Sequence, residues 1–169
     1  DMQYRSKKAI DNAHDKINSF IKNGKNVVRP LQRELRNIMW EHCGVVRAED
    51  RLNIGIDKID NLKSLLPTVD VRPDSEGFED LMIAFDLEAS IMSAESTILS
   101  ALERRESRGA HQRSDFENLE ESQNINYLLK LDNNNLKVER RPLEILSDEL
   151  KNAINDTKDI KNFSGKLIE

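Results

Sequence analysis

The residues most capable of chemistry in this chain of 169 residues are gathered between positions 104 and 115, here called the polar segment. Four arginines, one histidine and two acidic residues fall within it. Such side chains form charge-assisted hydrogen bonds, so the polar segment is suited to docking against polar groups of another protein segment, or to binding an anion. The candidates for interdomain docking are Arg105, Arg108, His111, Arg113 and Asp115.

A second interpretation of the polar segment is structural. If a long helix ends near Arg108, then Arg104 and Arg105 also lie in its last turn, where cations interact favourably with the helix dipole. Gly109 is then the left-handed residue that follows the helix. This interpretation leaves the polar residues after Gly109 unexplained, because exposed charges in a loop add little to stability.

Familiar catalytic and metal-binding motifs are missing from the sequence. It has no G-x-G-x-x-G, no Walker sequence, no C-x-x-C and no H-E-x-x-H. His42 and Cys43 are adjacent, but neighbours on a helix point about 100° apart, so they do not form a nucleophile and base pair. His14 lies on an apolar stripe, where we expect it to pack at the edge of the core. We therefore assign no catalytic, cofactor-binding or metal-binding residue.

The composition is that of one soluble helical domain. Apolar residues make up 37% and charged residues 34%, and the apolar residues recur along the whole chain. No apolar run approaches the roughly 20 residues that span a bilayer, so direct membrane insertion is not expected. The single cysteine fits a cytoplasmic setting. The net charge of −5 argues against binding to nucleic acid.

Helical spacing of apolar residues predicts a bundle built on one long helix. That helix covers 78–108 and carries two stripes at helical spacing. One lies at 78, 81, 82, 85, 89, 92, 96 and 99, where all positions but Ser96 are apolar, and the other runs through Leu87, Ile91, Ala94, Ile98 and Leu102. Three shorter helices precede it, and Trp40 lies beside the apolar stripe of the second. The shorter helices are 10–21, ended by Gly24; 30–44, with Pro30 in its first turn and Gly44 as terminator; and 52–66, ended by Pro67. Asp74 or Ser75 is the predicted N-cap of the long helix.

The region after the polar segment changes to strand spacing. Tyr127, Leu129 and Leu131 alternate with polar residues, as do Leu136 and Val138 beyond an asparagine-rich connector, which predicts a β-hairpin. Helical spacing resumes from Leu146 to about Asn162. The fold class is therefore mainly α, a helical bundle around one long helix with a small β-hairpin near the C-terminus. We divide the single domain, 1–169, into a helical bundle (1–115), a loop and β-hairpin (116–142), and a C-terminal helix and tail (143–169).

Two segments resemble a known family. Residues 106–115, E-S-R-G-A-H-Q-R-S-D, closely resemble the signature E-S-R-G-A-H-x-R-x-D in the C-terminal region of fumarate reductase and succinate dehydrogenase flavoprotein subunits. Residues 35–47 resemble the L-x-x-I-M-W-x-x-x-G-V-x-R stretch of the same family. The two segments occur in this chain in the same order as in the family, and at a similar separation. Two features depart from the family pattern: Phe116-Glu117-Asn118-Leu119 replaces the usual proline and acidic stretch, and a helix follows Pro142.

The resemblance implies a non-catalytic C-terminal helical domain that braces or docks on the flavin-binding domain of the same polypeptide. FAD and the substrate-binding residues belong to the flavin-binding and capping domains, so the fragment is not expected to be catalytic in isolation. An iron–sulfur subunit is a further implied partner, with a cytoplasmic location peripheral to the membrane through partner subunits. The alternatives are a stand-alone helical interaction module and the equivalent domain of L-aspartate oxidase. Ala110 and Arg113 favour the succinate and fumarate enzymes.

Overall fold

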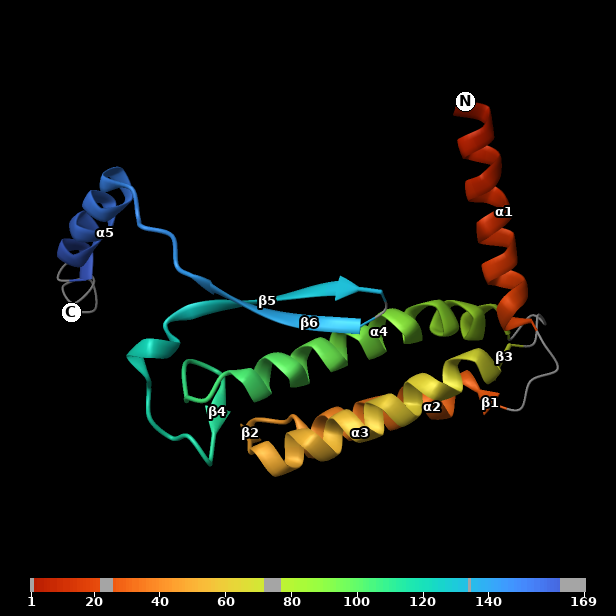
Figure 1. Ribbon diagram of the computed structural model, residues 1–169, viewed down its shortest axis with the longest axis horizontal. Coiled ribbons are helices and arrows are strands. Elements are labelled where there is room, and N and C mark those ends of the chain that lie inside the picture. Colours follow the sequence, from red (N-terminus) through yellow and green to blue (C-terminus); the bar gives the residue numbers. More distant parts are fainter. Residues whose placement is uncertain (1, 22–25, 72–76, 134, 162–169) are drawn as a thin grey trace, which may run out of the picture.

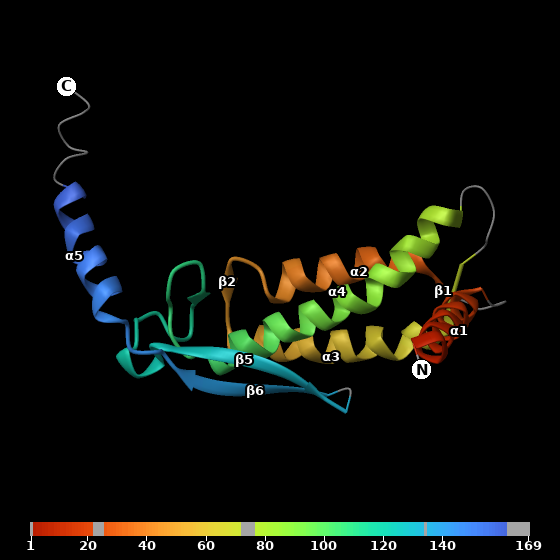
Figure 2. The same ribbon diagram turned by 90° about the horizontal axis from the view of Figure 1, so that it is seen from above.

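Three helices form the centre of the molecule. The computed structural model describes residues 2–21, 26–71, 77–133 and 135–161. Helices α2 (Val28–His42), α3 (Glu49–Leu65) and α4 (Gly77–Glu103) run side by side and pack pairwise against one another (Figures 1 and 2). The predicted bundle around one long helix is confirmed. Gly24, Asp74 and Ser75, to which the sequence assigned helix boundaries, lie outside the described residues.

The buried face of α4 alternates small and large apolar residues. Its members follow one another at steps of three and four positions, which places them on one side of the helix. The small residues let α2 and α3 approach the α4 backbone closely, and the large ones fill the space between the helices. They form one hydrophobic core with residues such as Leu35 and Ile59 of the neighbouring helices. The buried face consists of Ala84, Leu87, Ile91, Ala94, Ile98 and Ala101.

Of the two stripes predicted on α4, the second is the one in the core. The first stripe is only partly covered, and Met82, one of its members, is 68% exposed. Both stripes have helical spacing, so spacing alone did not rank them. The buried stripe lies on the face of α4 whose alanines permit close packing.

Helix α1 (Met2–Phe20) includes the predicted helix but begins eight residues earlier, and its apolar stripe faces solvent over most of its length. Phe20 of this stripe reaches the core. Its ring packs edge to face on that of Phe85, with 5.2 Å between the ring centres. His14 is exposed, so the expectation that it packs at the edge of the core was wrong. The reason is geometric, because α1 projects away from the three central helices (Figure 1).

Short parallel strand pairs tie the ends of the bundle. Strand β1 (Asn26–Val27) pairs with β3 (Val69–Asp70), beside the 3₁₀ turn η1 (Leu66–Thr68) that follows α3. At the other end, β2 (Val46–Arg47) pairs with β4 (Gln112–Arg113). The second pair joins the two segments that carry the family resemblance.

The predicted β-hairpin is confirmed. Strand β5 (Ile125–Asp132) follows the 3₁₀ turn η2 (Glu121–Gln123) and pairs antiparallel with β6 (Asn135–Pro142). The turn places Asn133 at φ +48°, a conformation that asparagine tolerates better than most residues. In Figures 1 and 2 the hairpin lies along α4, and both strands contact that helix.

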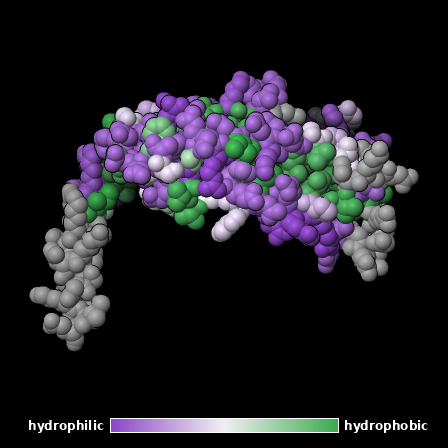
Figure 3. All heavy atoms as spheres, turned by 90° about the horizontal axis from the view of Figure 1, so that it is seen from below, coloured by the Kyte–Doolittle hydropathy of each residue, from purple (hydrophilic) through white to green (hydrophobic). Residues whose placement is uncertain are grey.

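Helix α5 (Asp148–Lys161) confirms the predicted C-terminal helix and lies apart from the bundle (Figure 1). On the side of the molecule shown in Figure 3, hydrophilic residues predominate and hydrophobic ones occur in small groups. Within the described ranges, no helix is both long enough and apolar enough to cross a lipid bilayer.

Gly44 is required by a close backbone approach at the end of α2. Helix α2 ends at His42, and Gly44 follows as the chain turns toward β2. A β-carbon at this position would lie 2.7 Å from the carbonyl oxygen of Trp40. The predicted turn glycine is therefore needed for space.

We predict that Gly44→Ala lowers the free energy of unfolding by about 1–3 kcal/mol, because the new methyl group meets backbone that cannot move aside. Urea unfolding followed by circular dichroism measures this. Val45→Ala, at the exposed neighbouring position, serves as the matched control and should change the same quantity by less than about 0.5 kcal/mol. Equal stability of the Gly44→Ala variant and the unmodified chain would contradict the steric account.

Candidate functional site

The polar segment begins where α4 ends, at Glu103. The prediction that Arg104, Arg105 and Arg108 form the last helical turn was therefore wrong. Arg108 and His111 exchange two backbone hydrogen bonds, at 2.8 and 3.0 Å, that close a two-residue turn. Gly109 has φ +59°, so its predicted left-handed conformation is confirmed. It occupies the first central position of a tight turn, where glycine is preferred, and not the position after a helix.

A buried carboxylate holds the start of the polar segment. Glu106 is 0% exposed and accepts hydrogen bonds from Arg104 at 2.5 Å and from Arg108 at 2.8 Å, both to Oε1. Its Oε2 accepts from the backbone N–H of Glu120 at 2.9 Å. An unpaired carboxylate in this position would be strongly destabilising, so each of these donors is needed.

The charge of Glu106 is stabilised within the fold. Burial alone would raise the pKa of its carboxyl group, but hydrogen bonds from Arg108, the Glu120 N–H and Arg104 outweigh burial and lower the pKa to about 2. Glu106 is therefore ionised at neutral pH and fixes two arginines by charge-assisted hydrogen bonds.

Arg113 closes the C-terminal end of α4. Its side chain is 1% exposed, and Nη1 donates to the carbonyl oxygens of Ala101 at 2.6 Å and of Arg104 at 3.3 Å. Such carbonyls at a helix end have no partner within the helix itself. The guanidinium also lies 5.0 Å from the centre of the Phe116 ring. Arg113 thus performs the helix-end role that the sequence had assigned to the arginines before it.

Asp115 connects the same arginine to the start of α3. Nε and Nη2 of Arg113 each donate to one carboxylate oxygen of Asp115 at 2.7 Å, a bidentate pair. Asp115 Oδ2 also accepts from the backbone N–H of Glu49 at 2.8 Å. Ala48, the N-cap residue of α3, has no side-chain oxygen, so Asp115 supplies the missing cap from a distant part of the chain. The hydrogen bond from Arg113 is the main reason that the pKa of Asp115 falls to about 2.

His111 joins the polar segment to β2. Arg47 Nη1 lies 2.9 Å from His111 Nδ1, and His111 Nε2 lies 3.1 Å from the carbonyl oxygen of Arg104. Arginine only donates, so Nδ1 accepts and Nε2–H donates to the carbonyl. Burial and the nearby charges of Arg47, Arg113 and Arg104 lower the pKa of His111, which keeps the ring neutral in the physiological range.

The structure therefore separates the five predicted docking candidates. Arg108, His111, Arg113 and Asp115 make hydrogen bonds within the domain. Arg105 is exposed, with its guanidinium 6.0 Å from the centre of the Phe116 ring. Whether any of the five also contacts another domain stays a prediction. The sequence alone did not indicate the roles of Glu106 and Arg47. An acidic residue among arginines was a signal for Glu106, but nothing in the sequence placed Arg47 beside His111.

His42 and Cys43 lie at the end of α2 as expected. Cys43 is buried, and burial raises the pKa of its thiol, which disfavours the reactive thiolate. Both ring nitrogens of His42 are buried without a hydrogen-bond partner in the described part of the chain. Among the same residues, no group of three or more His, Cys, Asp or Glu side chains is placed to hold a metal ion.

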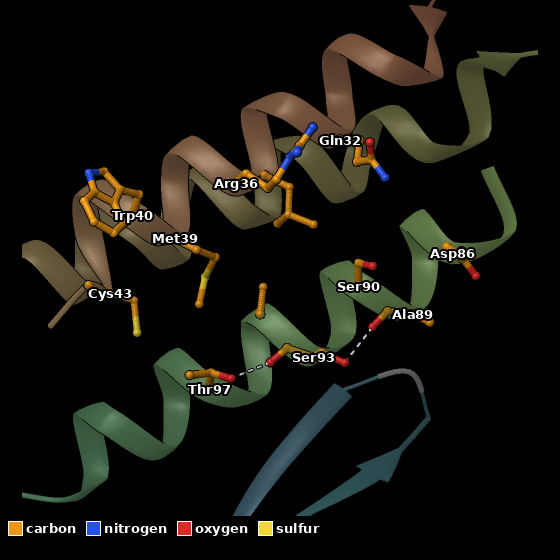
Figure 4. A pocket seen from close by; sticks show the side chains of 13 residues that line it. Gln32, Arg36, Met39, Trp40, Cys43, Asp86, Ala89, Ser90, Ser93 and Thr97 are labelled. Atoms are coloured by element: carbon orange, nitrogen blue, oxygen red, sulfur yellow. Dashed lines mark hydrogen bonds between the residues drawn. The ribbon is translucent and has the colours of Figure 1, made fainter. Parts of the chain in front are cut away.

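A groove between α2 and α4 is a second candidate surface (Figure 4). Its volume is about 760 Å³. Trp40 stands at its rim and is 77% exposed, while Met39 points into the groove from the same helix. The α4 side presents small residues, among them Ala89 and Ser93. A large exposed indole beside a floor of small side chains is typical of a surface that another protein segment covers.

The described residues thus define a helical domain whose polar segment clamps the ends of its own helices. The family described as "Fumarate reductase flavoprotein C-term" matches residues 32–159. The chain belongs to this family of C-terminal domains of fumarate reductase and succinate dehydrogenase flavoprotein subunits.

Individual relatives agree with this membership. The chain is 35% identical over 69% of its length to an uncharacterized FAD-dependent oxidoreductase of Methanocaldococcus jannaschii, covering 20% of that protein. It is 35% identical over 58% of its length to the fumarate reductase flavoprotein subunit of Haemophilus influenzae, covering 16% of it. An L-aspartate oxidase of Nicotiana tabacum is also 35% identical, over 57% of this chain and 15% of that protein. The chain therefore spans at most a fifth of the length of these relatives.

A solved structure confirms the fold. Mycobacterium smegmatis Sdh1, determined in complex with UQ1, superposes with a TM-score of 0.79 at 19% identity. The superposition covers 88% of this chain and 26% of that one. At this identity the likeness concerns the fold alone.

We predict that Arg113→Ala destabilises the chain by about 3–5 kcal/mol, because it removes the ion-pair partner of Asp115 and the side-chain donor to the Ala101 carbonyl. Arg105→Ala is the matched control, an arginine of the same segment that is exposed, and should cost less than about 0.5 kcal/mol. Urea unfolding of both variants provides the comparison. Equal losses in the two variants would contradict the clamp.

We predict that the chain loses stability as the pH falls from about 4.5 toward 2. Glu106 and Asp115 have folded-state pKa values of about 2, below their ordinary values of 4.5 and 3.8. Their contribution is present above the ordinary pKa and is lost as protons bind in the unfolded state first. Urea unfolding at several pH values measures the slope, which Glu106→Gln should make shallower. An unchanged slope in this variant would count against an ionised Glu106.

Proposed function

We propose that this domain docks on the flavin-binding domain of the same polypeptide and braces it, without contributing a catalytic residue. The longer protein is then a FAD-dependent oxidoreductase of the succinate dehydrogenase and fumarate reductase type. Two facts support the proposal: family membership, and the small share of the relatives' length that the chain spans. Within the polar segment, Arg104, Arg108 and Arg113 are paired with carboxylates of this domain.

The groove with Trp40 is the observation that carries the docking proposal. The indole of Trp40 is 77% exposed, so the domain alone lacks most of the stabilisation that burial of this side chain would bring. The groove is mainly apolar, and its α4 wall is formed by short side chains that let another backbone approach closely. A segment of the preceding flavin-binding domain would cover Trp40 and complete the packing of α2 and α4.

The same proposal extends to cofactor, partners and location. FAD would be held by the flavin-binding domain and by none of the residues of this chain. An iron–sulfur subunit would exchange electrons with that flavin, and the complex would lie on the cytoplasmic side as a peripheral component of a membrane-bound assembly. The oxidoreductase supplies hydride transfer through the flavin, while this domain contributes rigidity to the surrounding structure.

A second candidate function follows from the relatives. The L-aspartate oxidase of Nicotiana tabacum matches this chain at the same 35% identity as the Haemophilus influenzae fumarate reductase subunit. The two candidates are separated by assaying the longer protein with succinate or fumarate and with L-aspartate. A third possibility, a stand-alone interaction module, requires that no glycine-rich dinucleotide fingerprint be encoded upstream.

We predict that Trp40→Ala weakens the longer protein without unfolding this domain. A tryptophan at the centre of an interface typically contributes about 2 kcal/mol or more to binding. FAD retention during gel filtration and the unfolding temperature of the longer protein should both fall. The 169-residue chain carrying the same substitution should keep its own stability within about 0.5 kcal/mol, because the indole is exposed there.

Tyr4→Ala is the control, since Tyr4 is an exposed aromatic residue on α1 and does not line the groove. It should leave FAD retention unchanged. Full FAD retention and an unchanged unfolding temperature in the Trp40→Ala protein would overturn the docking role of the groove.

A further inference from the structure

A separate pocket lies where α4, β2 and β5 meet the polar segment. Its volume is about 360 Å³. Arg47 of β2 and His111 form one side, two serines of α4 form another, and Leu129 of β5 provides an apolar wall. The pocket lies within one domain, beside the clamp, and the groove with Trp40 is a different cavity.

Arg47 stands out among the arginines at this end of the bundle. Arg104 is paired with Glu106 and Arg113 with Asp115, whereas Arg47 makes no ion pair with any described carboxylate. Its Nε donates to the carbonyl oxygen of Gly44 at 3.2 Å, and its Nη1 donates to His111 Nδ1. Within the described ranges Nη2 has no partner. A half-buried guanidinium with a free edge is an incomplete arrangement, since arginine in such positions is generally paired.

His111 holds the guanidinium of Arg47 in position and carries no charge of its own. Its ring is neutral and uses both nitrogens, one accepting from Arg47 and the other donating to the Arg104 carbonyl. The ring therefore fixes the guanidinium of Arg47 in place at the pocket wall. The positive charge that faces the pocket and lacks a paired carboxylate is that of Arg47.

Helix α4 supplies hydroxyl donors to the lining of the pocket. Ser96 and Ser100 are four residues apart on α4, so they lie on the same side of the helix and both line the pocket. Neither hydroxyl has a hydrogen-bond partner among the described residues. Leu129 and Ala101 complete the lining with apolar surface.

We propose that this pocket binds a carboxylate group through Arg47, Ser96 and Ser100. A guanidinium edge and two hydroxyls match the planar, singly charged carboxylate, and the apolar wall fits the carbon chain attached to it. A phosphate, with a second charge, would have no second unpaired cation to meet. The carboxylate has two sources: a small carboxylic acid in solution, or an acidic side chain from another part of the longer polypeptide.

The test uses malonate as the probe, at constant ionic strength, with the neutral malonamide as its control. Nδ1 of His111 contacts Arg47 and the ring lines the pocket, so the NMR resonances of its ring nitrogens report on the pocket. Malonate should shift them in a saturable manner, and malonamide should not. Arg47→Ala should weaken malonate binding about tenfold or more, as expected for loss of a charge-assisted hydrogen bond. Arg105→Ala, the exposed arginine outside the pocket, should leave binding unchanged.

Two further variants keep the test decisive if Arg47→Ala does not fold. Ser100→Ala and the double variant Ser96→Ala, Ser100→Ala retain the contact between Arg47 and His111 and should weaken malonate binding several-fold. A saturable shift of the His111 resonances by malonate in both the chain and the longer protein would identify a free carboxylic acid as ligand. Binding to the chain alone would identify an acidic side chain of the longer polypeptide, which already fills the pocket. Absence of a saturable shift in the chain, or serine variants that bind malonate as tightly as the unmodified chain, would overturn the proposal.

Discussion

The arrangement of the whole bundle depends on the buried guanidinium of Arg113. Five N–H groups on a rigid planar fork let one side chain serve three elements. It donates to carbonyls at the end of α4, binds both oxygens of Asp115, and through that carboxylate reaches the first N–H group of α3. The end of one helix and the start of another thus share a single ion pair. A lysine could not replace this arginine, because a point charge lacks the fork that satisfies carbonyl and carboxylate together.

The charges around this clamp are balanced nearly pair by pair. Glu106 forms ion pairs with Arg104 and Arg108, and Asp115 forms one with Arg113. Most of the arginine charge in this segment is therefore neutralised within the domain. Arg105 and Arg47 have no ion pair with a described carboxylate: Arg105 is exposed, and Arg47 lines a pocket. Because most of its charged side chains are paired within the domain, the polar segment has a mainly structural role. The proposed contacts with other molecules involve Arg47 and the exposed Trp40 instead.

Two distinct surfaces follow from this division. The groove between α2 and α4 is apolar and open, which suits contact with a large protein surface (Figure 4). The pocket beside Arg47 is smaller and places a guanidinium and two serines next to apolar surface, which suits one charged group with a carbon chain. Both include residues near the end of α2, where the chain turns at Gly44 toward β2.

Local patterns in the sequence were sufficient for the helices, the β-hairpin and the family. Helical spacing is a property of neighbours three and four residues apart, and the segment from Glu106 to Asp115 is specific enough to identify relatives. Which stripe of α4 enters the core depended on the shape of α2 and α3, so periodicity alone could not decide it. The meeting of Arg47 with His111, 64 positions later, was also settled by tertiary structure. The parallel pairing of β2 with β4 brings these residues together, and two-residue strands leave no signal in the sequence strong enough to predict their partner.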